Sequence, residues 1–225
     1  MGTLSVVATP IGNLGDITLR ALETLRQSDT IACEDTRVTS KLLAKYDIQK
    51  PLLVFHARSS RVASERILAQ LAEGKRVALV TDAGTPGISD PGNELVAEVR
   101  RRLPEATIEC VPGPSALTAA LSIAGAPTHE FVFLGFLPHK KGRQTLFKEI
   151  AQEKRAVVFY ESPHRIEKAL ASLSSILLAG KQVTVLRELT KLHEDVVQGT
   201  PAEVASHFTQ AKDEVRGEFV VVVTG

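Results

Sequence analysis

Three turns rich in glycine and proline are the segments of this sequence best suited to holding a ligand. They are Thr9–Asp16, Thr81–Gly92 and Val111–Ser115, and each follows a short apolar run. In open α/β sheets, ligands bind at the carboxyl ends of the strands, which is where these turns are expected to lie. The second turn is the most informative, because its glycines would let a ligand lie directly against the backbone. The first and third could also be ordinary tight turns.

Other ligand-binding and catalytic motifs are missing. Gly74-Lys75 and Gly180-Lys181 are not followed by Ser or Thr, so the sequence contains no phosphate-binding P-loop. The segment Gly113–Leu117 lacks the closing glycine of a hydrolase nucleophile elbow. The histidines show no paired metal-ligand spacing and no Cys-x-x-Cys is present, so we expect no metal site.

Clusters of carboxylates are the best candidates for moving a proton. Glu34 and Asp35 follow the second predicted strand, and Glu161 and Glu188 each end a later one. A carboxylate in such a place could act as a general base. A structural role is the alternative: Asp35 could cap the next helix, and Glu34 could pair with Arg37.

The elements that must position these residues predict an α/β protein with two α/β domains. In the first half, short β-branched strands alternate with amphipathic helices, which indicates a parallel sheet with helices on both faces. In the second half, the strands at 182–188 and 195–198 are joined too tightly for a helical crossover, so we expect an antiparallel pair in a mixed sheet. The predicted domains are 1–112 and 113–225.

Local signals refine these elements. Asp16 is the expected N-cap of a helix at 17–27, and Asp90-Pro91 is expected to start another helix. A helix at 62–73 should bury a face that begins with Val62. The second half should contain helices at 114–124, 142–152, 164–178 and 201–211 and strands at 131–137, 156–161, 182–188, 195–198 and 218–224.

Composition is typical of a cytoplasmic, soluble protein. The net charge is +1, so any nucleic-acid contact must come from a local basic surface. No apolar run is long enough to span a membrane, and the N-terminus lacks the basic start of a signal peptide. Cys33 and Cys110 both lie in apolar runs, and we expect both to be reduced and buried.

The combination of motifs resembles the tetrapyrrole-methylase superfamily, whose members use S-adenosylmethionine (SAM). The segments Asp82–Gly92 and Val111–Leu121 look like its signature loops. Within the superfamily, Val7–Thr18, Cys33–Arg37, Phe159–Ile166 and Arg187–Glu194 are similar to the branch that methylates the ribose 2′-O of a cytidine in 16S rRNA. That branch usually continues into a short helical domain after the last strand, and we expect this extension to be absent here.

The resemblance implies that SAM binds in the cleft between the two domains. It also implies a homodimer that acts on 16S rRNA or the small ribosomal subunit. The positions that match the family's cofactor-binding residues are Pro10, Gly84, Thr85, Pro86, Ile88, Ser115, Ala116, Tyr160, Glu161, Glu188 and Leu189.

Methyl transfer to a ribose hydroxyl needs in-line positioning and removal of the hydroxyl proton. The expected catalytic residues are Glu34, Asp35, Arg37 and Glu161. RNA phosphates are expected to contact Arg37, Lys140, Lys141, Arg143 and Arg165. Two alternatives stay open at this point: carbon methylation of a tetrapyrrole by the same fold, and a module that binds SAM or RNA without catalysis.

Overall fold

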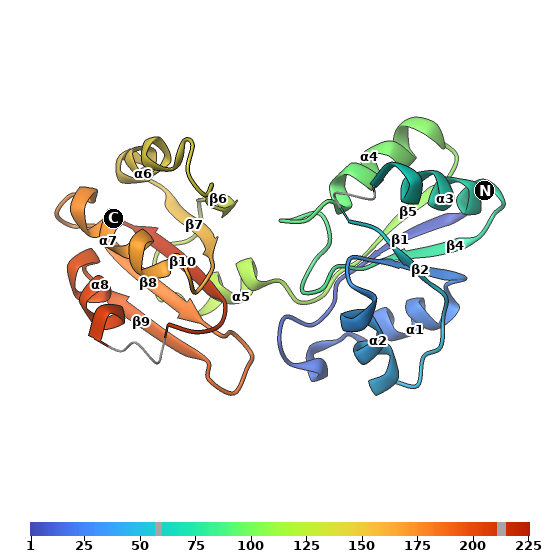
Figure 1. Ribbon diagram of the computed structural model, residues 1–225, viewed down its shortest axis with the longest axis horizontal. Coiled ribbons are helices and arrows are strands. Elements are labelled where there is room, and N and C mark those ends of the chain that lie inside the picture. Colours follow the sequence, from blue (N-terminus) through green and yellow to red (C-terminus); the bar gives the residue numbers. More distant parts are fainter. Residues whose placement is uncertain (57–59, 211–214) are drawn as a thin grey trace. The chain divides into compact units, whose positions relative to one another are not determined.

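The chain folds into two compact units, seen in a computed structural model that describes residues 1–56, 60–210 and 215–225. Unit 1 comprises residues 1–115 and unit 2 comprises residues 116–225. Each unit is a sheet covered by helices, as Figure 1 shows. The division falls after Ser115, where the sequence predicted it after residue 112.

Unit 1 contains a parallel five-stranded sheet, as the sequence predicted. Its strand order is β3-β2-β4-β1-β5, and every pairing in it is parallel. The strands are β1 (Thr3–Val7), β2 (Thr30–Cys33), β3 (Leu52–Val54), β4 (Arg76–Leu79) and β5 (Thr107–Val111). The inner strands are buried on both faces, which explains why they lack apolar–polar alternation.

Helices cover both faces of this sheet (Figure 1). On one face, α1 (Leu19–Gln27) and α2 (Thr36–Lys45) pack through leucines, and on the other α3 (Ser60–Ala72) and α4 (Gly92–Arg102) do the same. The neighbouring strands β1 and β4 therefore lead into helices on opposite faces. Such a topological switch point opens a crevice at the carboxyl ends of the two strands, where ligands bind in open α/β sheets.

Three local predictions in unit 1 outside the second turn are wrong. Thr18, not Asp16, is the N-cap of α1, since its hydroxyl accepts from the Ala21 amide at 3.1 Å, and Asp16 ends a short 3₁₀ helix, η1 (Leu14–Asp16). Val62 is 66% exposed, because the buried face of α3 runs through Ile67, about 140° further around the helix. Cys110 is exposed on the edge strand β5, while Cys33 is buried as expected.

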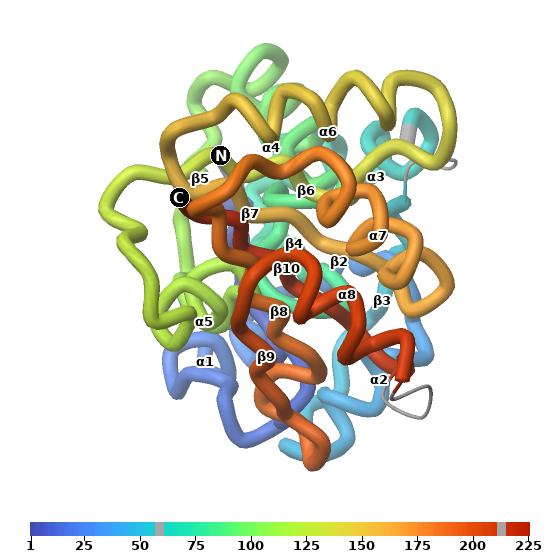
Figure 2. The backbone as a smooth tube through the Cα atoms, turned by 90° about the vertical axis from the view of Figure 1, so that its left-hand side faces the viewer, coloured from blue at the N-terminus to red at the C-terminus, as the bar shows by residue number. Residues whose placement is uncertain are grey.

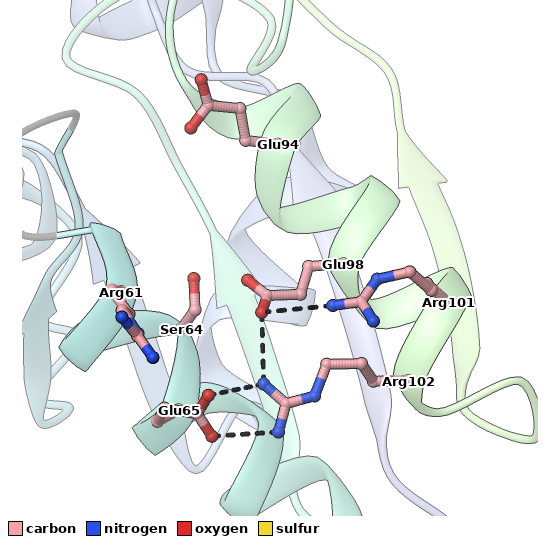
Figure 3. Close-up of a pocket in the computed structure, with 7 residues that line it drawn as sticks. All are labelled: Arg61, Ser64, Glu65, Glu94, Glu98, Arg101 and Arg102. Carbon is pink, nitrogen blue, oxygen red and sulfur yellow. Dashed lines mark hydrogen bonds and ion pairs between the residues drawn. The ribbon is translucent and has the colours of Figure 1, made fainter.

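Charged side chains join α3 and α4 at their outer surface. Figure 3 shows Arg102 between the two helices, donating to Glu65 at 2.6 and 3.0 Å and to Glu98 at 3.2 Å. Arg61 and Arg101 line the same notch. These groups are open to water, so the ion pairs contribute little individually to stability. The cluster has a structural explanation and involves none of the predicted site residues.

Unit 2 contains the predicted mixed sheet, in the order β6-β7-β10-β8-β9. β6 and β7 are parallel and the other pairs are antiparallel, including the predicted pair β8–β9. The strands are β6 (Phe131–Phe136), β7 (Ala156–Glu161), β8 (Gln182–Arg187), β9 (Asp195–Gly199) and β10 (Phe219–Thr224).

Three helices cover one face of the unit 2 sheet: α6 (Arg143–Gln152), α7 (Ile166–Ile176) and α8 (Pro201–Gln210). In Figure 2, α7 and α8 lie on one side of β7, β10 and β8, and α5 lies on the other side. α5 (Ala116–Ile123) contacts β10, and the Tyr160 hydroxyl bonds to the backbone of Leu117 in α5. The predicted helix 201–211 ends at Gln210, and residue 211 lies outside the described residues. Within those residues, no helix is both long and apolar enough to cross a membrane.

Candidate functional site

The three glycine- and proline-rich turns meet in unit 1, as the sequence predicted. Thr9, just after β1, and Gly84, just after β4, exchange backbone hydrogen bonds of 2.9 and 3.0 Å. Thr85 then reaches the third turn, because its hydroxyl donates to the Pro114 carbonyl oxygen at 3.1 Å. The turns thus form one surface of closely spaced backbone at the carboxyl end of the sheet.

Gly84 has a backbone conformation that favours glycine and lies in contact with two other turns. Its φ of +86° lies in the left-handed region that L-residues avoid. A Cβ atom there would approach the Ile11 methyl group at 3.4 Å and the Pro114 carbonyl oxygen at 3.8 Å. These are ordinary van der Waals distances, so the backbone conformation rather than crowding of a Cβ atom is what favours glycine here.

The second turn is braced by its own aspartate. The Asp90 carboxylate accepts from the amides of Gly87, at 2.8 and 2.9 Å, and of Gly92, at 2.8 Å. The prediction that Asp90 caps α4 is wrong, because Pro91 occupies the N-cap position and the helix begins at Gly92. Among the residues predicted to bind the cofactor, Pro86 is buried and Ile88 is 45% exposed. The turn is thus held in shape while the Ile88 side chain stays accessible.

Glu34 is joined to the start of the second turn. Its Oε1 accepts from the Thr81 hydroxyl and lies 3.4 Å from the Asp82 amide nitrogen. Asp82 in turn accepts from the Asp35 amide at 3.0 Å. The carboxylate of Glu34 therefore lies beside the glycine-rich turns. Thr81 and Asp82 belong to the turn that the sequence indicated, but nothing in their types identified them as partners of Glu34.

Asp35 has a structural role. It pairs with Arg37, the residue that the structural alternative had expected to pair with Glu34. Its carboxylate accepts from the Arg37 amide at 2.8 Å, which caps α2, and pairs with the Arg37 guanidinium at 2.6 Å. These hydrogen bonds lower the pKa of Asp35 to about 2 from an ordinary 3.8. A carboxylate with so low a pKa is a poor proton acceptor at neutral pH.

This shift predicts how acid affects the cap. The pKa of Asp35 is lower in the folded chain than in the unfolded chain. The ionised carboxylate therefore stabilises the folded chain, and this contribution is fully present above about pH 4. It should disappear as the pH falls through the folded pKa of about 2. Carbon-13 NMR of the Asp35 carboxyl group should titrate with a midpoint near 2, and the stability difference between the wild type and Asp35→Ala should shrink below pH 4. A midpoint near 3.8 would show that the capping geometry is not the solution structure.

In unit 2, Glu161 lies at the end of β7 with its side chain fully buried. It pairs with Arg143 at 2.6 Å and with Arg165 at 2.7 Å, and it accepts from the Ser162 amide at 2.9 Å. Two cations and an amide therefore satisfy this carboxylate. Such an environment argues against the predicted role of Glu161 as a catalytic residue and in favour of a buried structural ion triad.

The same triad changes the interpretation of two predicted phosphate contacts. The side chains of Arg143 and Arg165 are only 12% and 17% exposed. They also donate to the carbonyl oxygens of Pro138, at 3.2 Å, and of Leu137, at 2.9 Å. These guanidinium groups thus hold the loop that follows β6, and their burial argues against RNA contacts. Lys140 and Lys141, on that loop, are exposed and stay candidates for binding phosphate.

Tyr160 precedes Glu161 and points to the other face of the sheet. It packs edge-on against Phe133 and Phe136, with ring centroids 5.0 and 5.4 Å away. Burial raises the pKa of its hydroxyl, although a hydrogen bond to the Leu117 backbone lowers it in part. The phenol is therefore neutral at physiological pH and offers an apolar ring with one polar atom.

The turn after β8 has an unusual backbone. Glu188 and Thr190 have φ angles of +51° and +68°, and both lie beside the buried Leu189. Glu188 pairs with Lys191 at 2.7 Å and accepts from the Glu218 amide at 3.0 Å, so its pKa is lowered despite burial. Left-handed conformations at residues other than glycine often mark binding sites. The buried Thr190 hydroxyl has no hydrogen-bond partner among the described residues, and the sequence did not single it out.

These features fit an adenosyl sulfonium cofactor. A nucleoside needs close backbone approach, apolar contacts and a few polar atoms with free hydrogen-bonding capacity. Unit 1 offers the backbone of the turns around Gly84, where the Ile11 side chain and the Pro114 carbonyl oxygen also lie. Unit 2 offers the Thr190 hydroxyl beside Leu189. Ser115 and Ala116, at the start of α5, are half-buried. That SAM lies between the two domains stays a prediction.

Comparison of the whole chain with known proteins gives consistent matches. The profile of the tetrapyrrole (corrin/porphyrin) methylases matches residues 3–205. A protein of Thermotoga maritima called ribosomal RNA small subunit methyltransferase I is 49% identical over 225 residues, covering all of this chain and 99% of that protein. Proteins of the same name from Synechocystis sp. and Escherichia coli O157:H7 are 47% and 44% identical, again over all of this chain and over 80% and 78% of theirs.

Solved structures agree on the fold. The methyltransferase CobJ aligns with a TM-score of 0.73 at 21% identity, covering 100% of this chain and 95% of that one. Uroporphyrin-III C-methyltransferase from Thermus thermophilus, complexed with S-adenyl homocysteine, aligns with a TM-score of 0.66 at 18% identity, over 99% and 97% of the chains. The chain therefore belongs to the tetrapyrrole methylase family and, within it, groups with the ribosomal RNA small subunit methyltransferases I.

Proposed function

We propose that this chain is a SAM-dependent methyltransferase that modifies the 2′-oxygen of a cytidine ribose in 16S rRNA. The observation that carries the proposal is the position of Glu34 beside the glycine-rich turns, held by Thr81 and Asp82. The names of the relatives supply the RNA class, since all those cited are ribosomal RNA small subunit methyltransferases. A ribose hydroxyl is a poor nucleophile until it loses its proton, so a carboxylate is needed where the ribose binds.

Glu34 is the carboxylate best suited to accept that proton. The other candidates are already committed to cations: Asp35 to Arg37, Glu161 to two arginines and Glu188 to Lys191. Glu34 accepts a hydrogen bond from the neutral Thr81 hydroxyl and is only half-buried. Among the described residues, no cation lies within ion-pair distance of it. It keeps capacity for a further hydrogen bond from a ribose hydroxyl. Its role is to position and deprotonate the acceptor oxygen.

The remaining site residues bind SAM and align its methyl group with the acceptor oxygen. When bound, SAM supplies a methyl group already activated by the positive sulfur, so the protein provides orientation more than bond activation. The backbone of the turns around Gly84 and Thr85, together with Pro10 and Ser115, would hold the adenosyl part. In unit 2, we assign cofactor contacts to Tyr160 and to the turn that contains Leu189.

Replacing Glu34 by glutamine should reduce turnover by about 10²–10⁴-fold while leaving SAM affinity unchanged, because glutamine keeps the shape but cannot accept the proton. Transfer of labelled methyl to small-subunit RNA gives the rate, and calorimetry gives the affinity. Glu105→Gln, at an exposed position outside the turns, is the matched control and should keep full activity. Full activity of Glu34→Gln would remove this residue from the mechanism.

The acceptor is tested by offering labelled SAM with 16S RNA, with small ribosomal subunits and with a tetrapyrrole. Label in cytidine 2′-O-methyl supports the proposal, and label in the pigment would replace it with carbon methylation. Binding of SAM without transfer to any acceptor would leave only a binding module.

Ribosomal RNA is made in the bacterial cytoplasm, so we place the activity there.

A homodimer is the assembly that we propose from the family likeness. Analytical ultracentrifugation at micromolar concentration should give twice the mass of the 24.3 kDa chain. A monomer under the conditions of full activity would show that one chain is sufficient.

A further inference from the structure

A small hollow opens in unit 1 between the first turn, the end of β4 and α2. Its volume is about 270 Å³. Four apolar residues line it, Pro10, Leu14, Val38 and Leu42, and Lys41 and Asp82 supply its charged groups. Since β1 and β4 lead to helices on opposite faces, this hollow lies at the topological switch point of the sheet, where ligands bind.

We propose that this hollow receives the nucleoside that is methylated, and that α2 binds the phosphates on either side of it. The inference rests on the proposed function and specifies where the RNA lies. Its volume is slightly below the roughly 300 Å³ at which pockets for drug-sized molecules begin. That space suits one nucleoside and is too small for a tetrapyrrole macrocycle.

The walls of the hollow match the chemistry of a nucleoside. Leu14 and Val38 are each 40% exposed, which is enough to offer apolar contact to the face of a base. At the polar end, Asp82 accepts from the Asp35 amide at 3.0 Å, and its own amide lies 3.4 Å from Glu34 Oε1. A ribose at this end of the hollow would therefore lie next to the residues that hold the proposed base.

Basic side chains on α2 supply charge complementarity to RNA. Arg37, Lys41 and Lys45 are spaced four residues apart, so they follow one face of the helix at intervals of about 6 Å. All three are exposed, and Arg37 is 86% exposed even though it pairs with Asp35. Neither Lys41 nor Lys45 has an ion-pair partner in the part of the chain that the structure describes. These three residues, here called the α2 stripe, begin three residues after Glu34. The stripe borders the hollow, because Lys41 also lines it.

The chain as a whole is nearly neutral, with a net charge of +1. Any affinity for a polyanion must therefore come from basic residues gathered in one place. The α2 stripe meets this requirement within one helix, and it contacts phosphates without reading base identity. The hollow, in contrast, encloses a single nucleoside. Together they separate binding of the strand from selection of the nucleotide.

Filling the hollow tests the first half of the proposal. Val38→Trp places a large ring over it, and we expect methyl transfer to small-subunit RNA to fall by about tenfold or more while SAM affinity is retained. Val62→Trp, at a 66% exposed helix position on the opposite face of the sheet, is the matched control and should keep wild-type activity. Circular dichroism melting checks that both variants fold. A Val38→Trp enzyme that folds and works at the wild-type rate would overturn the assignment of the hollow.

Charge removal tests the second half without filling the hollow. For Lys41→Ala/Lys45→Ala, the negative slope of log affinity against log salt should become shallower by about 1.4. Each lysine that neutralises a phosphate of single-stranded RNA contributes about −0.7 to that slope. Lys148→Ala/Lys168→Ala removes the same charge from exposed positions on α6 and α7 and should leave the slope unchanged. An unchanged slope in the α2 variant would overturn the phosphate contacts. A wild-type chain that transfers no methyl to RNA would instead overturn the proposed function, and this inference with it.

Discussion

Glu161→Ala should lower the free energy of unfolding of unit 2 by about 3–5 kcal/mol. Glu161 is fully buried between Arg143 and Arg165, which are only 12% and 17% exposed. Removing the carboxylate would leave two cations in a poorly hydrated place without a counter-charge, and breaking a buried pair in this way costs about that amount. The loop that carries Lys140 and Lys141 should loosen as well, because both arginines hold its carbonyl oxygens.

The measurement can be confined to unit 2. The chain has two tyrosines, Tyr46 in unit 1 and Tyr160 in unit 2, and no tryptophan. In a Tyr46→Phe background, tyrosine fluorescence during urea unfolding reports on unit 2 alone, which avoids treating two units as a single transition. Glu149→Ala, at an exposed site on α6, is the control and should change stability by no more than about 0.5 kcal/mol. A similarly small change for Glu161→Ala would show that the ion triad is not formed in solution.

The second large effect concerns Gly84. Gly84→Val should abolish SAM binding, because valine resists the φ of +86° and its side chain would intrude among the three turns. The Ile11 methyl group and the Pro114 carbonyl oxygen already lie 3.4 and 3.8 Å from where a Cβ atom would stand. Calorimetric titration with SAM should show no heat of binding above the noise at concentrations that saturate the wild type.

Gly74→Val separates the loss of the site from backbone strain. Gly74 has a nearly identical φ of +84°, but a Cβ atom there would meet nothing within 4 Å. Both substitutions therefore share the conformational cost, and only Gly84→Val blocks the turns. We expect Gly74→Val to bind SAM like the wild type. If Gly84→Val retained the affinity of the wild type, the turns would not be the cofactor site.

The sheets were predictable because their pattern is local. Runs such as Thr30–Cys33 are buried at every position and lack apolar–polar alternation, and the tight link between β8 and β9 permits only an antiparallel pair. Helix starts were less predictable, because they depend on which hydroxyl or carboxylate reaches an amide. Asp16 and Asp90 both have the right residue type, but neither caps its helix: Thr18 caps α1, and the Asp90 carboxylate accepts from Gly87 and Gly92.

The sequence predicted which turns form the candidate site, but not which side chains contact one another within it. Glycine content identified the turn around Gly84, whereas the contact of Glu34 with Thr81 joins residues 47 positions apart. The burial of Arg143 could not be inferred from a loop that also contains exposed lysines. Thr190 was missed because its signal, a left-handed backbone and an unsatisfied hydroxyl, exists only in three dimensions.

The backbone bridge between Thr9 and Gly84 has a consequence for the thermodynamics of recognition. Since main-chain atoms alone make this bridge, the protein's own backbone joins the first two turns to each other. Little chain entropy then remains to be lost on association, which favours affinity. Side chains in these turns can also diverge during evolution without separating the two segments. Distant homologues can therefore keep the same fold while the methyl acceptor changes from a tetrapyrrole to a nucleic acid.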